Sequence, residues 1–218
     1  MKFIKLITKN HKKTKRNYFE RMNKFKIKNI HEAIKFSKNY WDGNRKFGYG
    51  GYFYDGRWKT IAKKIIKKYK LTNNSKIIDL GCGKGFLLKD IKDILPEIKI
   101  LGLDISSYAI KNKIDKNIKI IKGDMRKKLS FRNKEFDLAI SLNCIHNFDI
   151  IELDTTIPEI IRISKKQYIS TESYRNFNEL INLQCWALTC KSFFSKKEWI
   201  YLFKKYHFKG DIELIYFS

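Results

Sequence analysis

Short apolar runs recur along this chain, and they alternate with segments whose apolar positions follow a helical period. The runs predict six strands, at residues 75–80, 99–103, 118–122, 136–142, 167–171 and 211–217. Helices are expected at residues 31–40, 60–69, 86–95, 156–163 and 178–189, with two more beginning near Ser106 and after Ser195. Strands that alternate with helices are typical of a parallel sheet covered on both faces, so we expect an α/β fold.

The first 59 residues follow a different pattern. Residues 1–30 form a Lys-rich arm, which we expect to be loosely ordered or a basic helix. Residues 40–58 mix glycine with eight aromatic side chains and show no helical or strand period, which predicts an ordered loop. We therefore expect residues 1–59 to form a basic arm and a helical, Gly-aromatic cap. Residues 60–218 would form the main domain, with an insertion at about 174–194.

Composition and charge limit the class of protein. Hydrophobic residues make up 43% of the 218, which is enough for a sizeable core and suits one α/β domain with an extension. The formal net charge is +25, from 47 Lys and Arg against 22 Asp and Glu. A basic surface can collect nucleic-acid phosphates. The excess is mostly Lys and spread along the chain, which favours the residue usage of an AT-rich genome. Affinity for RNA, a membrane or an acidic substrate is the alternative.

Cysteine usage and hydropathy predict a cytoplasmic protein. The four cysteines, Cys82, Cys144, Cys185 and Cys190, form no CxxC pair, so free thiols and no metal site are expected. No apolar run approaches the roughly 20 residues that span a bilayer. The N-terminus lacks the long apolar core and small-residue cleavage site of a signal peptide.

One motif carries the strongest chemical signal. In residues 76–86, an apolar strand runs into Asp79 and then into a GxGxG turn at residues 81–85, and a helix follows. Glycines let the backbone turn tightly and approach a nucleotide closely. The next strand ends at Asp104, 19 residues beyond Gly85, where a carboxylate can accept hydrogen bonds from both ribose hydroxyls. This context predicts a nucleotide-type cofactor at the turn.

The order and spacing of four segments resemble the first four motifs of class I, Rossmann-like methyltransferases that depend on S-adenosylmethionine (SAM). These segments are residues 79–85, Asp104, residues 123–125 and residues 136–141, and the resemblance covers about residues 60–171. It implies an enzyme with SAM as its cofactor. SAM is favoured over NAD because an acid precedes the glycines and because Asp124 stands where the family contacts the adenine amino group.

The resemblance also assigns roles around the cofactor. The three glycines of the turn would face the methionine half, Asp104 the ribose, and Asp124 with Met125 the adenine. The cofactor-binding residues it implies are Asp79, Gly81, Cys82, Gly83, Gly85, Asp104, Ile105, Asp124, Met125 and Ser141. The family's sheet usually ends in an antiparallel hairpin of two strands, whereas here only residues 211–217 remain. We expect an antiparallel final strand, in a sheet of six strands or one rearranged by the insertion.

Three flanking segments resemble a bacterial subgroup of small-molecule methyltransferases. They are residues 49–58, 144–147 and 172–176, and they support the small-molecule class but not a particular reaction. We expect the acceptor to be an oxygen or nitrogen atom of a small molecule, with a sugar or another metabolite as examples. His146, just past the fourth strand, is the first candidate base, because His titrates near neutral pH. Glu172, at the end of the fifth strand, is the second, and it could instead orient an amine or a sugar hydroxyl. Candidate substrate-binding residues are Tyr52, Arg57, Asn143, Tyr174 and Arg175.

Several alternatives stay open. His146 could cap a helix or pack in the core, and Arg57 could pair with Asp55 or Asp42. An RNA methyltransferase is the second candidate function, motivated by the charge. Against it, residues 141–144 read Ser-Leu-Asn-Cys rather than the Asn/Asp-Pro-Pro-aromatic sequence that grips an exocyclic base nitrogen, and no Pro-Cys pair is present. A protein that only binds is less favoured, because the SAM motifs are intact.

Overall fold

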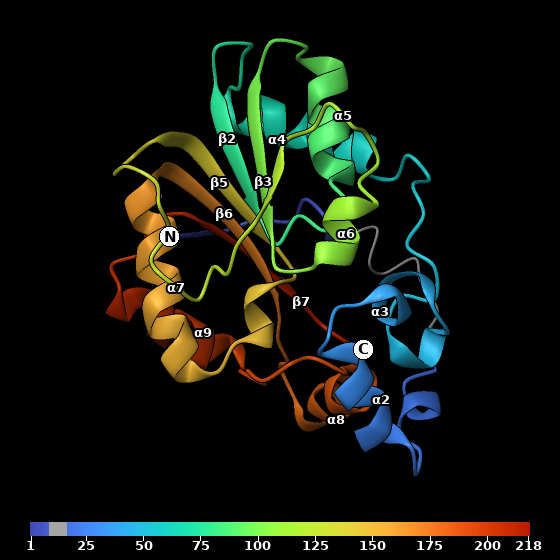
Figure 1. The fold of residues 1–218 in the computed structure, drawn as a ribbon. Coiled ribbons are helices and arrows are strands. Elements are labelled where there is room, and N and C mark those ends of the chain that lie inside the picture. The colour runs from blue at the N-terminus through green and yellow to red at the C-terminus, as the bar shows by residue number, and fades with distance from the viewer. Residues whose placement is uncertain (9–16) are drawn as a thin grey trace.

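A computed structural model describes residues 1–8 and 17–218 and has one seven-stranded sheet at its centre (Figure 1). The strands are β1 (Lys2–Phe3), β2 (Lys76–Leu80), β3 (Lys99–Asp104), β4 (Ile120–Lys122), β5 (Phe136–Leu142), β6 (Ser164–Glu172) and β7 (Asp211–Ile215). Their order is β1-β7-β6-β5-β2-β3-β4, and every neighbouring pair is parallel. The predicted α/β class and parallel sheet are confirmed, and the prediction of an antiparallel final strand is wrong.

The connection before β7 explains its direction. The chain leaves β6, passes through α8 (Phe177–Trp186) and α9 (Lys196–Lys205), and returns to the end of the sheet where the parallel strands begin. A helical crossover of this kind joins parallel strands, whereas a short hairpin would join antiparallel ones. The seventh strand comes from the N-terminus, where β1 pairs with β7 in parallel. Part of the expected loose arm therefore belongs to the sheet.

A buried carboxylate fastens this arm. Glu213 on β7 is fully buried, and its oxygens accept hydrogen bonds from the backbone N–H groups of Leu6, Ile7 and Thr8 at 2.7–3.1 Å. The Tyr168 hydroxyl donates to the same carboxylate at 2.6 Å. Because a buried charge is tolerated only when it is hydrogen-bonded, these donors hold the arm to the sheet.

Helices cover both faces of the sheet (Figure 1). On one face, α7 (Ile150–Ile163) and α9 pack their apolar side chains against Ile78 and its neighbours. On the other, α4 (Trp58–Tyr69) and α5 (Phe86–Ile94) pack against Ile77 and Leu138. Consecutive strand residues point to opposite faces, so Ile77 and Ile78 enter different cores. The short helix α6 (Ser107–Lys111) begins at its predicted cap, Ser106.

Local capping decides where several of these helices begin. The Asp149 side chain and Glu152 form a capping box, so α7 begins at Ile150 rather than near residue 156 as predicted. The predicted capping box of Ser195 and Glu198 is confirmed at the start of α9. The expected helix over residues 31–40 is two helices, α2 (Lys26–Ala33) and α3 (Lys38–Asp42).

The N-terminal elements gather beside α8, near the carboxyl ends of the strands (Figure 1). They are η1 (Phe19–Arg21), α2, α3 and η2 (Arg45–Phe47). The Arg21 guanidinium stacks on the Trp186 ring at 4.1 Å, and the Lys26 ammonium donates to the carbonyls of Gln184 and Cys185 at 2.7 and 2.6 Å. We call residues 37–58, which include α3 and η2, the cap.

Candidate active site

The glycine turn after β2 needs glycine for its backbone shape. Gly81, Gly83 and Gly85 have φ values of 79°, 56° and 79°, in the left-handed region that other residues rarely adopt. A Cβ on Gly81 would collide with the Cys144 sulfur, and one on Gly83 would lie 2.9 Å from the Trp41 ring. The turn is therefore held close against the loop after β5 on one side and the cap on the other.

Asp104 is fixed at the end of β3 and reaches the glycine turn. Its Oδ2 accepts from the Gly83 N–H at 2.7 Å, and its Oδ1 accepts from the Ser106 N–H at 2.8 Å. Burial raises the pKa of Asp104, and these backbone donors oppose that rise. Each oxygen keeps a further lone pair, so the carboxylate can still accept hydrogen bonds from a ligand's hydroxyls.

Asp79 is a buried carboxylate without a donor. It is only 3% exposed, and its Oδ1 has no hydrogen-bond partner in residues 1–8 or 17–218. Burial first, and then the nearby charge of Asp104, raise the pKa of Asp79 to about 7. An orphaned buried carboxylate is costly unless a cation or donor meets it. The glycine turn, Asp79 and Asp104 therefore fit SAM, which carries an ammonium group, a sulfonium group and ribose hydroxyls.

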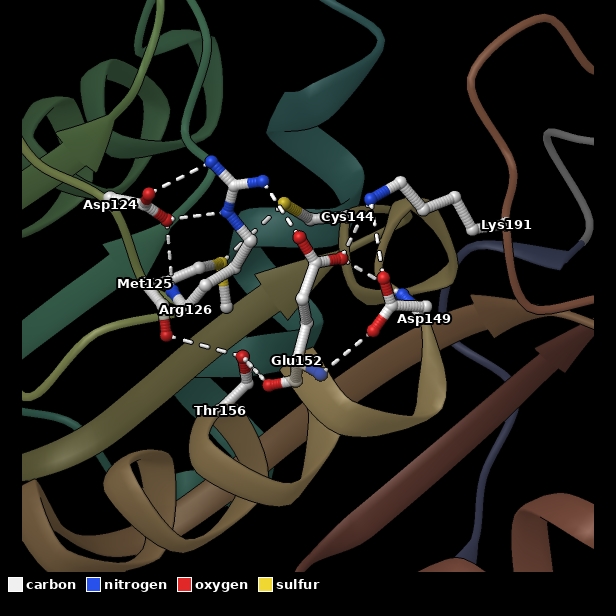
Figure 2. Close-up of polar contacts among 8 residues, drawn as sticks. All are labelled: Asp124, Met125, Arg126, Cys144, Asp149, Glu152, Thr156 and Lys191. Atoms are coloured by element: carbon white, nitrogen blue, oxygen red, sulfur yellow. Dashed lines mark hydrogen bonds and ion pairs between the residues drawn. The ribbon is translucent and has the colours of Figure 1, made fainter.

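An arginine clamps the loop that follows β4 (Figure 2). The Arg126 guanidinium contacts both oxygens of Asp124 at 2.8 Å and Glu152 of α7 at 2.9 Å. Its hydrogen bond is the main reason that the pKa of Asp124 is lowered. The Thr156 hydroxyl donates to the Met125 carbonyl at 3.2 Å. The two residues expected at the adenine are thus held rigidly against the start of α7.

The segment after α8 closes over the loop after β5. The Lys191 and Ser192 N–H groups donate to the His146 carbonyl at 2.9 and 3.0 Å. The Lys191 ammonium also lies 2.9 Å from Glu152 and 3.5 Å from Asp149, as Figure 2 shows. These contacts fix η3 (Ile145–Asn147), the turn that carries His146.

The structure brings the two candidate bases together. His146 Nε2 lies 3.7 Å from Glu172 Oε2, and the side chains are only 8% and 13% exposed. His146 Nδ1 is buried and has no hydrogen-bond partner within the described part of the chain. The Glu172 backbone is anchored, because the Trp199 indole N–H donates to its carbonyl at 2.9 Å.

The cap lies directly on the glycine turn. The Trp41 indole N–H donates to the Ser106 hydroxyl at 2.9 Å, and the Tyr52 ring stacks on Phe86 at 4.7 Å. The ammonium of Lys84, inside the turn, contacts both oxygens of Asp42 at 2.7 Å. Lys84 is 6% exposed, so this is a buried ion pair between the turn and the cap.

The other predicted substrate residues lie in different surroundings. Tyr52 is at the turn, whereas Arg57 is largely exposed and pairs with Asp55 at 2.6 Å, which was the alternative considered for it. Asn143 has a φ of 49° and accepts from the Ser170 hydroxyl at 2.8 Å. Tyr174 contacts Glu198 at 3.5 Å, and Arg175 pairs with Glu179 and lies 4.5 Å from the Tyr216 ring centre.

Three predicted cofactor residues differ in exposure. Ser141 is fully buried and its hydroxyl has no partner among the residues that the structure describes. Cys82 packs beside Gly102, and Ile105 is 41% exposed just after Asp104. The described residues contain no group of three His, Cys, Asp or Glu side chains that could hold a metal, and no helix long and apolar enough to cross a membrane.

Sequence reasoning missed several residues of the site. Tyr40 and Tyr49 of the cap lie within electrostatic reach of Glu172, and Asp42, Lys84 and Arg126 form the ion pairs described above. The Gly-aromatic composition of the cap was a signal for the segment. Nothing in that composition singled out Tyr40 and Tyr49, because Glu172 is distant from them in sequence.

Comparisons with known proteins agree with this geometry. Residues 77–167 match the family model described as a methyltransferase domain. The ubiquinone biosynthesis O-methyltransferase of Pelagibacter ubique is 27% identical over 162 residues, which cover 68% of this chain and 64% of that protein. The malonyl-(acyl-carrier protein) O-methyltransferase of Legionella pneumophila is 32% identical over 95 residues, which cover 40% and 33%. The chain thus spans less than two thirds of either relative.

A solved structure shares the fold. The SAM-dependent methyltransferase of Archaeoglobus fulgidus has a TM-score of 0.55 and 19% identity, over 68% of each chain. At this identity the likeness concerns the fold. The motif-bearing strands β2 to β6 lie within or next to the residues that the family model matches. Residues 77–167 thus match a methyltransferase domain, and the parallel sheet around them has the fold of class I, Rossmann-like methyltransferases, the family whose cofactor is S-adenosylmethionine.

Proposed function

We propose that this protein transfers a methyl group from SAM to an oxygen or nitrogen atom of a small molecule. One observation carries the proposal: the orphaned carboxylate of Asp79 and the His146–Glu172 pair lie at the carboxyl ends of neighbouring parallel strands. Open α/β sheets bind ligands at that edge. A cofactor site and a proton-accepting pair are therefore close to each other.

The chain's own residues supply binding and orientation. We propose that Asp79 and the glycine turn hold the methionine half, with Cys82 and Ser141 beside it, that Asp104 and Ile105 hold the ribose, and that the clamped Asp124 and Met125 hold the adenine. When bound, SAM supplies a methyl group already activated by the positive charge on its sulfur. The protein must mainly align the acceptor about 3–3.5 Å from that carbon.

Proton removal falls to His146 or Glu172 in this proposal. A hydroxyl or ammonium acceptor must lose a proton, and a base within reach typically contributes roughly 10²–10⁴ in rate. Tyr52, Asn143, Tyr174 and Arg175 would contact the substrate or the loops around it. Arg57 supports such a role only if its pair with Asp55 opens, because its guanidinium is already satisfied.

The cellular setting and the division of the chain belong to the same proposal. The four cysteines are free, which supports action in a reducing compartment such as the cytoplasm. We propose that residues 1–59 are an arm and cap, that residues 60–218 are the SAM-binding domain, and that residues 174–194 are an insertion closing over the acceptor. Contacts of Lys191 and Ser192 with the His146 carbonyl support the last point.

Methyl transfer from isotope-labelled SAM tests the proposal. The purified protein is incubated with a small-molecule extract of bacterial cells and, in parallel, with total RNA. Label should appear in a small-molecule fraction and be lost in Asp104→Ala. Label appearing only in RNA would favour the basic surface as the substrate site, and no label in either would contradict the proposal.

A further inference from the structure

The Glu172 carboxylate is nearly buried and has no hydrogen-bond partner among the residues that the structure describes. Its side chain is only 13% exposed. The nearest basic atom, Nε2 of His146, is 3.7 Å away, which is too far for a hydrogen bond. Other half-buried glutamates differ, because Glu152 and Glu159 each pair with an arginine at 2.7–2.9 Å. A carboxylate removed from water in this way is stabilised when a cation approaches it.

Two tyrosines of the cap stand near this carboxylate. The ring centres of Tyr40 and Tyr49 are 5.4 Å apart, and the Tyr40 hydroxyl also contacts Thr189. Tyr49 keeps 40% of its surface accessible although the Trp41, Tyr40 and Tyr52 rings lie within 5.4 Å. Burial of the Tyr49 hydroxyl first, and then the negative charge of Glu172, raise the pKa of Tyr49 to about 12, so the side chain stays neutral. Neutral aromatic faces beside a carboxylate attract cations.

The carboxylates around Tyr49 carry a charge opposite to the net charge of the whole chain. The formal net charge is +25, yet the charged groups that act most strongly on the Tyr49 hydroxyl are Glu172 and Asp104. Of the basic side chains nearby, Lys84 pairs with Asp42 and Arg126 with Asp124, while the Arg45 guanidinium donates to the Gly48 and Tyr49 carbonyls. An anionic site within a cationic protein selects a cationic ligand rather than a phosphate or carboxylate.

We propose that the methyl acceptor is the nitrogen of an amine, which enters as an ammonium ion and docks on Glu172 beside Tyr40 and Tyr49. This inference rests on the proposed function and narrows its substrate class. A hydroxyl acceptor would leave the Glu172 carboxylate without a hydrogen-bonded cation, because His146 Nε2 is 3.7 Å away, whereas an ammonium supplies both the charge and hydrogen-bond donors. A primary or a secondary amine fits, since either can lose a proton and still bond to the methyl carbon.

The transfer balances with the groups present. Glu172, or His146 next to it, takes one proton from the ammonium and frees the nitrogen lone pair. A nitrogen–carbon bond then forms to the methyl group, the carbon–sulfur bond breaks, and its electron pair stays on sulfur. The positive charge passes from sulfur to nitrogen.

An amine-blocking experiment tests the inference. A bacterial small-molecule extract is divided, and one half is treated with an amine-selective acylating reagent that is then quenched. Both halves are incubated with the protein and labelled SAM. We expect label in the untreated half, lost after acylation, with the methyl group on nitrogen by mass spectrometry. Label that survives acylation would overturn the amine assignment and leave the proposed methyl transfer standing, whereas no label in either half would overturn both.

Matched variants give a second readout that is independent of turnover. The compound titrated is the unmethylated form of the acceptor that mass spectrometry identifies. In calorimetry with the demethylated cofactor present, Glu172→Gln should bind it at least tenfold more weakly than the parent does. The SAM affinity of the variant should stay within twofold of the parent. Glu97→Gln removes the same charge at an exposed position before β3 and should change neither value. Tyr49→Phe keeps the ring and should bind the acceptor nearly normally, whereas Tyr49→Leu should weaken it. Unchanged acceptor affinity in Glu172→Gln would overturn the proposal.

Discussion

At the residue scale, the cofactor side of the site follows from a few carboxylates and glycines. The motif in the sequence identified Asp79, the glycine turn and Asp104 as candidates, and the structure places them within hydrogen-bonding or electrostatic reach of one another. The motif could not reveal that Arg126 donates hydrogen bonds to both oxygens of Asp124 and also contacts Glu152 of α7. That contact depends on where Glu152 lies, and residue spacing alone does not determine it.

Asp79 leads to a prediction about pH. Its pKa is raised to about 7, above the unfolded value of 3.8, so the ligand-free folded state holds this proton more tightly. The contribution of Asp79 to stability therefore falls as the pH rises from about 4 through 7. Asp79→Asn should raise the free energy of unfolding at pH 8 by roughly 1–3 kcal/mol and have little effect at pH 4. Urea unfolding at the two pH values measures this.

The same residue should make SAM binding depend on pH. Only the ionised carboxylate can pair with a cation, so the affinity of the parent for SAM should rise between about pH 6 and 7.5. This rise should disappear in Asp79→Asn. A variant with the parent's pH dependence and affinity would show that Asp79 does not meet the cofactor.

At the scale of elements, apolar patterning located the strands and did not reveal their partners. The runs at residues 75–80, 99–103 and 136–142 correspond closely to β2, β3 and β5. The predicted direction of β7 was wrong, because an apolar run in the sequence does not show whether a helical crossover or a short hairpin precedes the strand. The two residues of β1 were too few to show a period, and their pairing depends on the anchoring of the arm by Glu213.

The ion pair between Lys84 and Asp42 is expected to hold the cap on the glycine turn. Both side chains are under a fifth exposed, and Asp42 also accepts from the Tyr108 hydroxyl at 2.9 Å. Asp42→Ala leaves the buried Lys84 ammonium unpaired, so it should lower the free energy of unfolding by roughly 1–3 kcal/mol and weaken SAM binding. Thermal unfolding and calorimetry measure the two effects.

An exposed ion pair provides the control for the cap. Asp93 pairs with Lys89 on the surface of α5, so Asp93→Ala should cost less than about 0.5 kcal/mol. Equal losses in the two variants would mean that the cap pair is no more important than a surface pair.

At the scale of the whole molecule, composition indicated a globular protein, and charge did not indicate function. The lysines lie along the whole chain, whereas the candidate site is anionic around Asp79, Asp104 and Glu172. Net charge is a sum over the surface, so it cannot report the sign of a local site. The proposed acceptor chemistry depends on the fold, which brings Tyr40 and Tyr49 within electrostatic reach of Glu172.

The overall charge still predicts how the protein meets RNA. Binding to generic RNA should be weak and should fall steeply between 50 and 200 mM salt, as expected for phosphate contacts that release counterions. Fluorescence anisotropy with RNAs of unrelated sequence measures this. A tight, sequence-selective complex at physiological salt would instead make RNA the substrate to pursue.

Calorimetric titration of SAM tests most directly whether the carboxyl ends of β2 and β3 hold the cofactor. The parent should bind one SAM per chain. Asp104→Ala should bind more weakly by roughly 1.5–3 kcal/mol, since it loses hydrogen bonds to a charged group, while Glu97→Gln should match the parent. Failure of the parent to bind SAM, or identical affinities in the parent and Asp104→Ala, would contradict the account.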